Sequence, residues 1–186
     1  MKILLHVCCA NCAIYPLTML RQDGHDVTGY FQNPNIHPYQ EFKRRLDTVK
    51  QYADIADLQM IYDENYRLEE FLAAVASNPA ERCHYCYSSR MEETAKLAAE
   101  QGFEGFSTSL LYSRYQKHDE IRGLGEELAA RFGLTFVYDD FRTGWQDGIR
   151  ESKAMGLYRQ QYCGCIYSEK ERYLPKPKAK GTDASG

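Results

Sequence analysis

Short apolar runs alternate along the chain with longer segments in which apolar residues recur at helical spacing. The runs are typical of buried strands and cover residues 2–7, 26–31, 58–62, 103–107 and 134–138. The other segments predict amphipathic helices, one ending near residue 24 and the rest at 39–56, 65–76, 80–101, 118–132, 144–155 and 169–173. This alternation favours a doubly wound sheet. We therefore predict an α/β, Rossmann-like fold with about five parallel strands, in which ligands bind beyond the carboxyl ends of the strands.

The chain has 186 residues, the length of one domain, which we place at residues 1–174. Lys, Pro and Gly are frequent at 175–186, where we expect a flexible basic tail. No apolar run approaches the roughly 18 residues of a membrane span, and the N-terminus lacks a signal-peptide pattern. We therefore expect a cytoplasmic protein that does not contact a membrane. The net charge of −3 argues against binding nucleic acid by bulk electrostatics and leaves room for a local basic face.

Cysteine is the most informative residue type, because all seven cysteines fall in three tight clusters. Disulfides are rare in the cytoplasm, where cysteine clusters more often bind metal or carry out redox chemistry. One tetrahedral ion needs four ligands, so seven exceed the needs of a single zinc. A cubane iron–sulfur cluster takes four and leaves three for a second metal or a redox pair. The expected metal ligands are Cys8, Cys9, Cys12, Cys83, Cys86, Cys163 and Cys165.

Each cluster occupies a distinct position in the predicted fold. The turn CCANC follows the first strand, where many nucleotide-binding proteins have a glycine-rich phosphate loop, and it contains no glycine. The CHYC motif at 83–86 matches either half of a metal site or a thioredoxin-like redox pair. Its position in the middle of the chain, after a proline, favours metal binding. The CGC motif at 163–165 lies in a loop, where exposed free thiols would oxidise readily.

Several polar residues near the predicted ligand-binding edge are candidates for catalysis. His118 and Asp119 follow the fourth strand near the ligand-binding edge, and we expect them to donate protons. Their alternative roles are a surface residue at a helix N-terminus and a helix cap. The predicted helix at 39–56 carries a run of positive charge, Lys43, Arg44 and Arg45, which by default forms an ordinary solvated face.

Five segments in this order resemble the QueH family of epoxyqueuosine reductases: LLHVCCANC, FQNPNIHPYQEFKRR, ERCHYCYSSRM, FSTSLLYSRYQKHDEI and YRQQYCGCIYS. They span residues 4–168, and their combination is specific although no single one is. The chain departs from the family pattern at Asn11, where proline is frequent, and at Cys12, where some members carry aspartate.

The resemblance implies an oxidoreductase that removes the epoxide oxygen of epoxyqueuosine in tRNA, the last step of queuosine biosynthesis, without cobalamin. It implies a [4Fe–4S] cluster, a second mononuclear iron and a fold similar to adenine-nucleotide α-hydrolases of the PP-loop type. We expect tRNA and an external electron donor as partners. The residues expected to contact the tRNA phosphates are Lys43, Arg44, Arg45, Arg114, Lys117 and the Lys-rich tail. The first candidates for binding the cluster are Cys8, Cys9, Cys83 and Cys86, although the sequence leaves the division of the seven cysteines between the two metals open.

Two other functions fit parts of the pattern. A PP-loop enzyme that inserts sulfur into tRNA also combines an α/β sheet with cysteines, but it needs a phosphate loop that the CCANC turn lacks. A zinc-binding module without catalytic activity would leave three of the seven cysteines unexplained. A brown anaerobic preparation would exclude the zinc module, and an ATP-binding measurement would test the sulfur-insertion enzyme.

Overall fold

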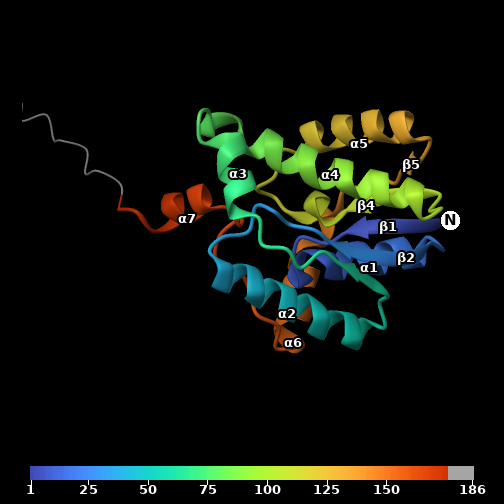
Figure 1. Cartoon of the computed structure of the whole chain (residues 1–186). Coiled ribbons are helices and arrows are strands. Elements are labelled where there is room, and N and C mark those ends of the chain that lie inside the picture. Colours follow the sequence, from blue (N-terminus) through green and yellow to red (C-terminus); the bar gives the residue numbers. More distant parts are fainter. Residues whose placement is uncertain (176–186) are drawn as a thin grey trace, which may run out of the picture.

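A five-stranded parallel sheet forms the centre of the computed structural model, which describes residues 1–175 (Figure 1). Its strand order is β3-β2-β1-β4-β5, and every neighbouring pair is parallel. The strands are β1 (Lys2–His6), β2 (Asp26–Phe31), β3 (Met60–Tyr62), β4 (Gly105–Thr108) and β5 (Thr135–Phe136). The predicted α/β class with a parallel sheet is therefore confirmed. The expected tail at 175–186 lies, apart from its first residue, outside the described residues.

Helices cover both faces of the sheet. They are α1 (Ala10–Gln22), α2 (Tyr39–Ala56), α3 (Leu68–Val75), α4 (Arg82–Glu100), α5 (His118–Phe132), α6 (Trp145–Ala154) and α7 (Ile166–Tyr173). Short 3₁₀ turns lie at η1 (Pro79–Glu81), η2 (Ser109–Tyr112) and η3 (Phe141–Gly144). None of the helices within residues 1–175 has the length and apolar character needed to cross a membrane.

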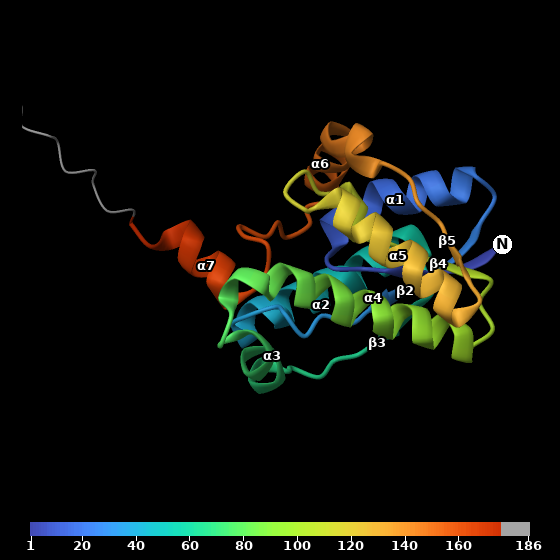
Figure 2. The same cartoon turned by 90° about the horizontal axis from the view of Figure 1, so that it is seen from above.

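The layers follow from the strand order. Helices α1 and α2 lie on one face, whereas α4 and α5 lie side by side on the other (Figures 1 and 2). Helix α6 packs against α1, and α7 lies beyond the carboxyl ends of the strands. The order in which strands are added to the sheet reverses between β1 and β4, so the loops after these two parallel strands diverge and leave a crevice at the carboxyl edge.

The predicted elements agree with the structure except near some ends. Helix α3 begins at Leu68 instead of residue 65, because the Asn65 amide donates to the Asp63 side chain at 3.1 Å and holds a turn there. Helix α7 begins at Ile166 instead of residue 169, and its N-cap is Cys165, whose sulfur accepts the Ser168 N–H at 3.4 Å. This thiol therefore ends the CGC loop and starts the helix.

Candidate metal centre

The first cysteine cluster lies at the point between β1 and β4 where the strand order of the sheet reverses. Strand β1 ends at His6 and delivers Cys8 to the carboxyl edge, beside Ser109, which follows β4. The Cys8 N–H donates to the Ser109 hydroxyl at 3.0 Å, and this hydroxyl lies 3.3 Å from the Cys8 sulfur, to which it donates. The two loops of the crevice are thus joined at the first thiol.

Three thiols occupy the turn where a phosphate loop would otherwise lie. The sulfur atoms of Cys8, Cys9 and Cys12 all lie within 4.8 Å of one another, and each side chain is almost fully buried. Hydrogen bonds from the Cys12 and Cys9 thiols hold the pKa of Cys8 well below its usual range, whereas burial raises the pKa of Cys9. Cys9 is also the N-cap of α1, where the helix dipole favours an anion.

The other four cysteines form a second group. Cys83 and Cys86 lie one turn apart at the start of α4, and Cys163 and Cys165 come from the loop before α7. Cys86 and Cys165 belong to one small apolar cluster. Burial raises the pKa of Cys86 to about 12; the nearby Arg90 charge lowers it, and the other three thiols raise it. Among the described residues, the close approach of sulfur atoms within 4.8 Å is found for Cys8, Cys9 and Cys12 alone.

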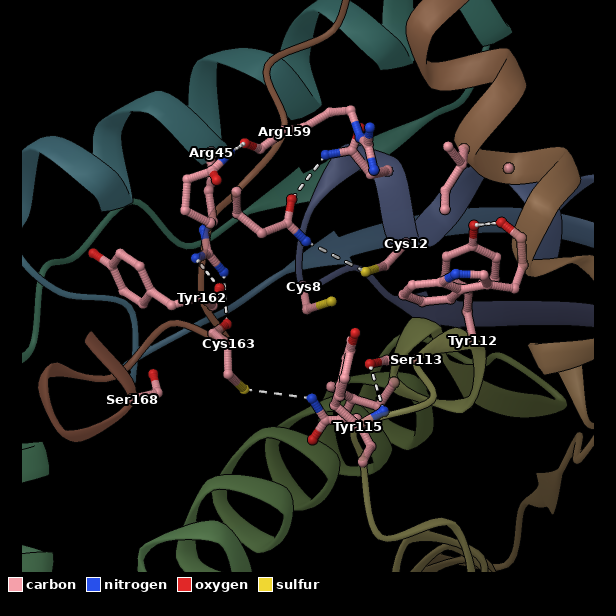
Figure 3. A pocket seen from close by; sticks show the side chains of 18 of the residues that line it. Cys8, Cys12, Arg45, Tyr112, Ser113, Tyr115, Arg159, Tyr162, Cys163 and Ser168 are labelled. Carbon is pink, nitrogen blue, oxygen red and sulfur yellow. Dashed lines mark hydrogen bonds between the residues drawn. The ribbon is translucent and has the colours of Figure 1, made fainter. Parts of the chain in front are cut away.

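Both groups border one cavity of about 750 Å³. Cys8 and Cys12 lie on one side of it and Cys163 on another, as Figure 3 shows. A cavity of this size accommodates a nucleoside-sized ligand. The first and third cysteine clusters therefore meet at one hollow, whereas Cys83 and Cys86 are not among its lining residues and α4 reaches it through Arg90.

A buried ion pair anchors the loop that carries Cys163. Arg45 and Glu41 pair at 2.7 Å, and their side chains are only 2% and 7% exposed. The same guanidinium donates to the backbone oxygens of Cys163 at 2.8 Å and Tyr162 at 2.9 Å (Figure 3). Glu41 also accepts the Tyr158 hydroxyl proton at 2.5 Å. The expectation that Arg45 binds RNA phosphate is wrong, because its donors are used inside the protein.

Amide side chains contact the thiols directly. Gln160 donates to the sulfur of Cys9 at 2.9 Å and to that of Cys12 at 3.6 Å. Asn11 in turn donates to the Gln160 side-chain oxygen at 2.8 Å and to the Tyr158 carbonyl at 2.9 Å. Asn11, at which the chain departs from the family pattern, therefore holds the Gln160 amide in place, and that amide contacts two thiols.

His118 and Asp119 are not among the residues that line the cavity. The His118 side chain is buried and donates from Nε2 to the Leu111 carbonyl at 2.9 Å, while its Nδ1 lies 3.4 Å from the Tyr138 hydroxyl. Asp119 is exposed on the first turn of α5. This placement gives no support to the expectation that either residue donates a proton at the site.

Sequence reasoning missed several residues that shape the site. Ser109 and Gln160 lie in the segments that resemble the family. Both side chains are uncharged, so nothing in the sequence was a reason to select them as site residues. His6 ends β1 fully buried, and burial followed by the Arg90 charge lowers its pKa to about 4. The neutral ring bonds Thr108 at 3.0 Å and the Gln32 carbonyl at 3.2 Å. The sequence signal that could have identified His6 is a histidine within an apolar strand, one residue away from two adjacent cysteines.

The chemistry of the donor set fits metal. Buried thiols within 4.8 Å of one another cannot all ionise unless a cation compensates their charge. Thiolates select zinc, copper(I) or iron in iron–sulfur clusters over hard cations. All seven cysteines are free, so no disulfide competes for them. Arg90, which is 3% exposed and donates to the Cys86 carbonyl at 2.7 Å, forms no ion pair within residues 1–175.

Comparison with known proteins adds three findings. The sequence model of the family described as epoxyqueuosine reductase QueH matches residues 3–171. A protein of that name from Dehalococcoides mccartyi is 40% identical over 172 residues, which cover 92% of this chain and 94% of the relative. Its namesake from Thermotoga maritima is 36% identical over 180 residues, with 91% of each chain covered.

A solved structure shares the fold. It is described as a predicted subunit of a tRNA methyltransferase from Methanocaldococcus jannaschii, and it aligns with a TM-score of 0.56 over 82% of this chain and 74% of its own. At 14% identity, this likeness concerns the fold alone. The sequence matches are far closer and cover nearly the whole chain. This chain belongs to the epoxyqueuosine reductase QueH family.

Proposed function

We propose that this protein reduces epoxyqueuosine to queuosine within tRNA. The observation that carries the proposal is the cavity of about 750 Å³, which two groups of thiols border and which is large enough for the modified nucleoside. The reaction consumes two electrons and two protons. Both carbon–oxygen bonds of the epoxide break, a carbon–carbon double bond forms, and the oxygen leaves as water. An external reductant supplies the electrons.

The four-cysteine group fits a [4Fe–4S] cluster, which takes four thiolates. We assign it to Cys83, Cys86, Cys163 and Cys165. The division differs from the set Cys8, Cys9, Cys83 and Cys86 expected from the sequence, because that set draws two thiols from each group.

The three-thiol group of Cys8, Cys9 and Cys12, with its sulfur atoms within 4.8 Å, would hold a single second iron. When bound, the cluster supplies electrons singly and the second iron acts as a Lewis acid toward the epoxide oxygen. We propose that the reaction proceeds without cobalamin, since the seven cysteines would hold the metals that it needs.

The side chains around the cavity prepare it for this reaction. Gln160 holds Cys9 and Cys12 by its amide, so two of the three thiols keep their orientation when metal binds. The buried Arg90 guanidinium lines the cavity and supplies a positive charge that no carboxylate within residues 1–175 neutralises. This charge stabilises electron density that accumulates at the site during reduction. Tyr112 and Trp145 form a wall of stacked rings that keeps water from one side of the substrate.

Anaerobic reconstitution followed by an assay tests the proposal. The protein, loaded with iron and sulfide and supplied with dithionite, is expected to remove one oxygen mass from epoxyqueuosine in tRNA, as read by mass spectrometry of the nucleosides. Tightly bound zinc in place of iron, or an unchanged nucleoside mass with fully loaded protein, would refute it.

Two substitutions test the division of the cysteines and serve as controls for each other. Cys86→Ser is expected to lose inorganic sulfide and most of the iron, while the second iron stays. Cys12→Ser is expected to keep the sulfide and lose about one iron per chain. Equal sulfide loss in both variants would contradict the division into groups of four and three.

A further inference from the structure

The rim of the cavity carries an unusually exposed aromatic side chain. Tyr115 is 85% exposed and lines the cavity from the loop between η2 and α5 (Figure 3). The neighbouring Tyr112 is only 3% exposed and lies deeper in the same wall. Exposing a large ring to water is unfavourable, so Tyr115 is available for a partner that covers it.

The surroundings of Tyr115 are rigid and aromatic. Its ring meets the Trp145 ring edge-on, with centroids 6.0 Å apart and an interplanar angle of 78°. Trp145 itself stacks on Tyr112 at 5.1 Å and 28°, and the Tyr112 hydroxyl donates to the Trp145 carbonyl at 2.9 Å. A Cβ at Gly148 would lie 2.4 Å from the Tyr112 oxygen, so only glycine lets α6 approach this closely. Tyr112 and Trp145 are therefore held in place before a ligand arrives, and Trp145 gives the exposed Tyr115 ring a firm neighbour.

Positive charge surrounds these rings although the chain as a whole is acidic. The Arg114 guanidinium lies 5.6 Å from the centroid of the Trp145 ring. Arg159 and Arg172 line the same cavity. None of these three arginines forms an ion pair with another residue of 1–175, whereas most arginines elsewhere in that range do. Unpaired arginines beside exposed rings match a polymer of phosphates and flat bases.

We propose that Tyr115, supported at its edge by Trp145, forms a stacking platform for an unpaired base next to the nucleotide that enters the cavity, with Arg114 near the phosphate of that base. The proposal rests on the proposed function, because a nucleoside that remains part of an RNA chain must bring its neighbours to the cavity rim. Single-stranded RNA loops are commonly bound by bases that stack on aromatic side chains. A protein partner would not need an open ring face beside a nucleoside-sized hollow, so the geometry favours RNA.

Trp145 provides a direct readout because it is the only tryptophan in the chain. The iron-loaded protein is titrated anaerobically with an unmodified RNA stem–loop and, in parallel, with a blunt RNA duplex of the same length. Stacking is expected to change Trp145 emission with the stem–loop and much less with the duplex. An equal response to both RNAs would show backbone binding alone and overturn the platform.

Substitutions at Tyr115 separate stacking from other roles. Tyr115→Ala is expected to weaken stem–loop affinity about tenfold, whereas Tyr115→Phe retains it. The matched control is Tyr39→Ala, at a tyrosine that is 54% exposed and is not among the residues that line the cavity. Iron content is expected to stay unchanged in all three. Wild-type affinity in Tyr115→Ala, or equal loss in the Phe variant, would overturn the proposal.

The outcomes distinguish this proposal from the proposed function. RNA binding is measured without any reduction of epoxyqueuosine, so a stacking platform can be established even if the protein proves inactive on that nucleoside. The alternative is that Tyr115 binds a protein electron donor. If Tyr115→Ala keeps its RNA affinity, and ferredoxin reduces this variant more slowly than the wild type while dithionite reduces both equally fast, the platform is a protein interface and the RNA assignment is wrong.

Discussion

Replacing Arg45 with Gln tests whether one buried guanidinium holds the second cysteine group together. The substitution removes the 2.7 Å ion pair with Glu41 and the bonds of 2.8 and 2.9 Å to the carbonyls of Cys163 and Tyr162. Losing one partner of a buried pair costs about 3–5 kcal/mol, because the other charge stays buried without compensation. In a domain of this size each kcal/mol lowers the melting temperature by about 2–4 °C. We therefore expect a fall of roughly 6–20 °C.

The measurement is thermal unfolding of the metal-free protein, followed by circular dichroism, together with iron and sulfide counts after anaerobic reconstitution. Arg44→Gln is the matched control, since this neighbouring arginine is exposed and rests only against the Tyr158 ring at 5.7 Å. The control is expected to change stability by no more than about 0.5 kcal/mol. Arg45→Gln is expected to retain less sulfide, because the Cys163 loop has lost its anchor.

A double variant separates the buried charge from the anchor. Arg45→Met combined with Glu41→Gln leaves no unpaired charge, so part of the stability is expected to return. The bonds to the Cys163 loop remain absent, so sulfide retention is expected to stay low. The reasoning is refuted if Arg45→Gln melts within about 2 °C of the wild type, or if the double variant regains full sulfide content.

Three further substitutions probe the site and its support. Arg90→Gln is expected to shift the midpoint potential of the reconstituted cluster to more negative values, because a positive charge that favours the reduced state is lost; Arg90→Lys should lie closer to the wild type in an EPR-monitored titration. Asn11→Ala removes bonds of 2.8 and 2.9 Å around Gln160 and is expected to cost about 1–3 kcal/mol in thermal unfolding and to release the second iron faster to a chelator. His37 is fully buried, and burial lowers its pKa to about 4, so the unfolded chain binds more protons between pH 4 and the usual value of 6.5. Stability of the metal-free protein should fall as the pH drops through this window, and denaturant titrations of His37→Phe should show a flatter dependence.

The fold could be predicted from the sequence, because the apolar pattern and the turn residues indicate the same bounds for nearly every helix and strand. The segment DVTGYF reads as a buried strand and forms β2, and the Pro79 break precedes α4 as expected. What could not be read is local bonding. The Asp63 side chain delays α3 by holding Asn65 in a turn, which depends on one hydrogen bond that the apolar pattern does not report.

The site was predictable in composition but not in arrangement. Clustering alone indicated that all seven cysteines are chemically important, yet the proposed division into groups of three and four depends on distances between thiols that the sequence pattern does not report. Arg45 illustrates the limit most clearly. In the run KRR it looks like part of a basic surface, but helical periodicity turns it inward to Glu41. Lys43 and Arg44 remain exposed on the other side of the same helix.

The buried arginines explain how the sheet edge can hold so many thiols. A helix N-terminus after β1 is suited to an anion, and here it carries cysteine thiols, among which Cys8 has a lowered pKa, in place of a phosphate loop. Thiolates in a buried site need positive charge both before and after metal binds, since a cluster with four thiolate ligands remains anionic. Arg45 lies near Cys9 and Cys163, and Arg90 lies near Cys86 and His6, so each group has a guanidinium at its side. Because these charges are fixed by packing, they are present before metal arrives, and they favour thiolate over thiol at the moment of assembly.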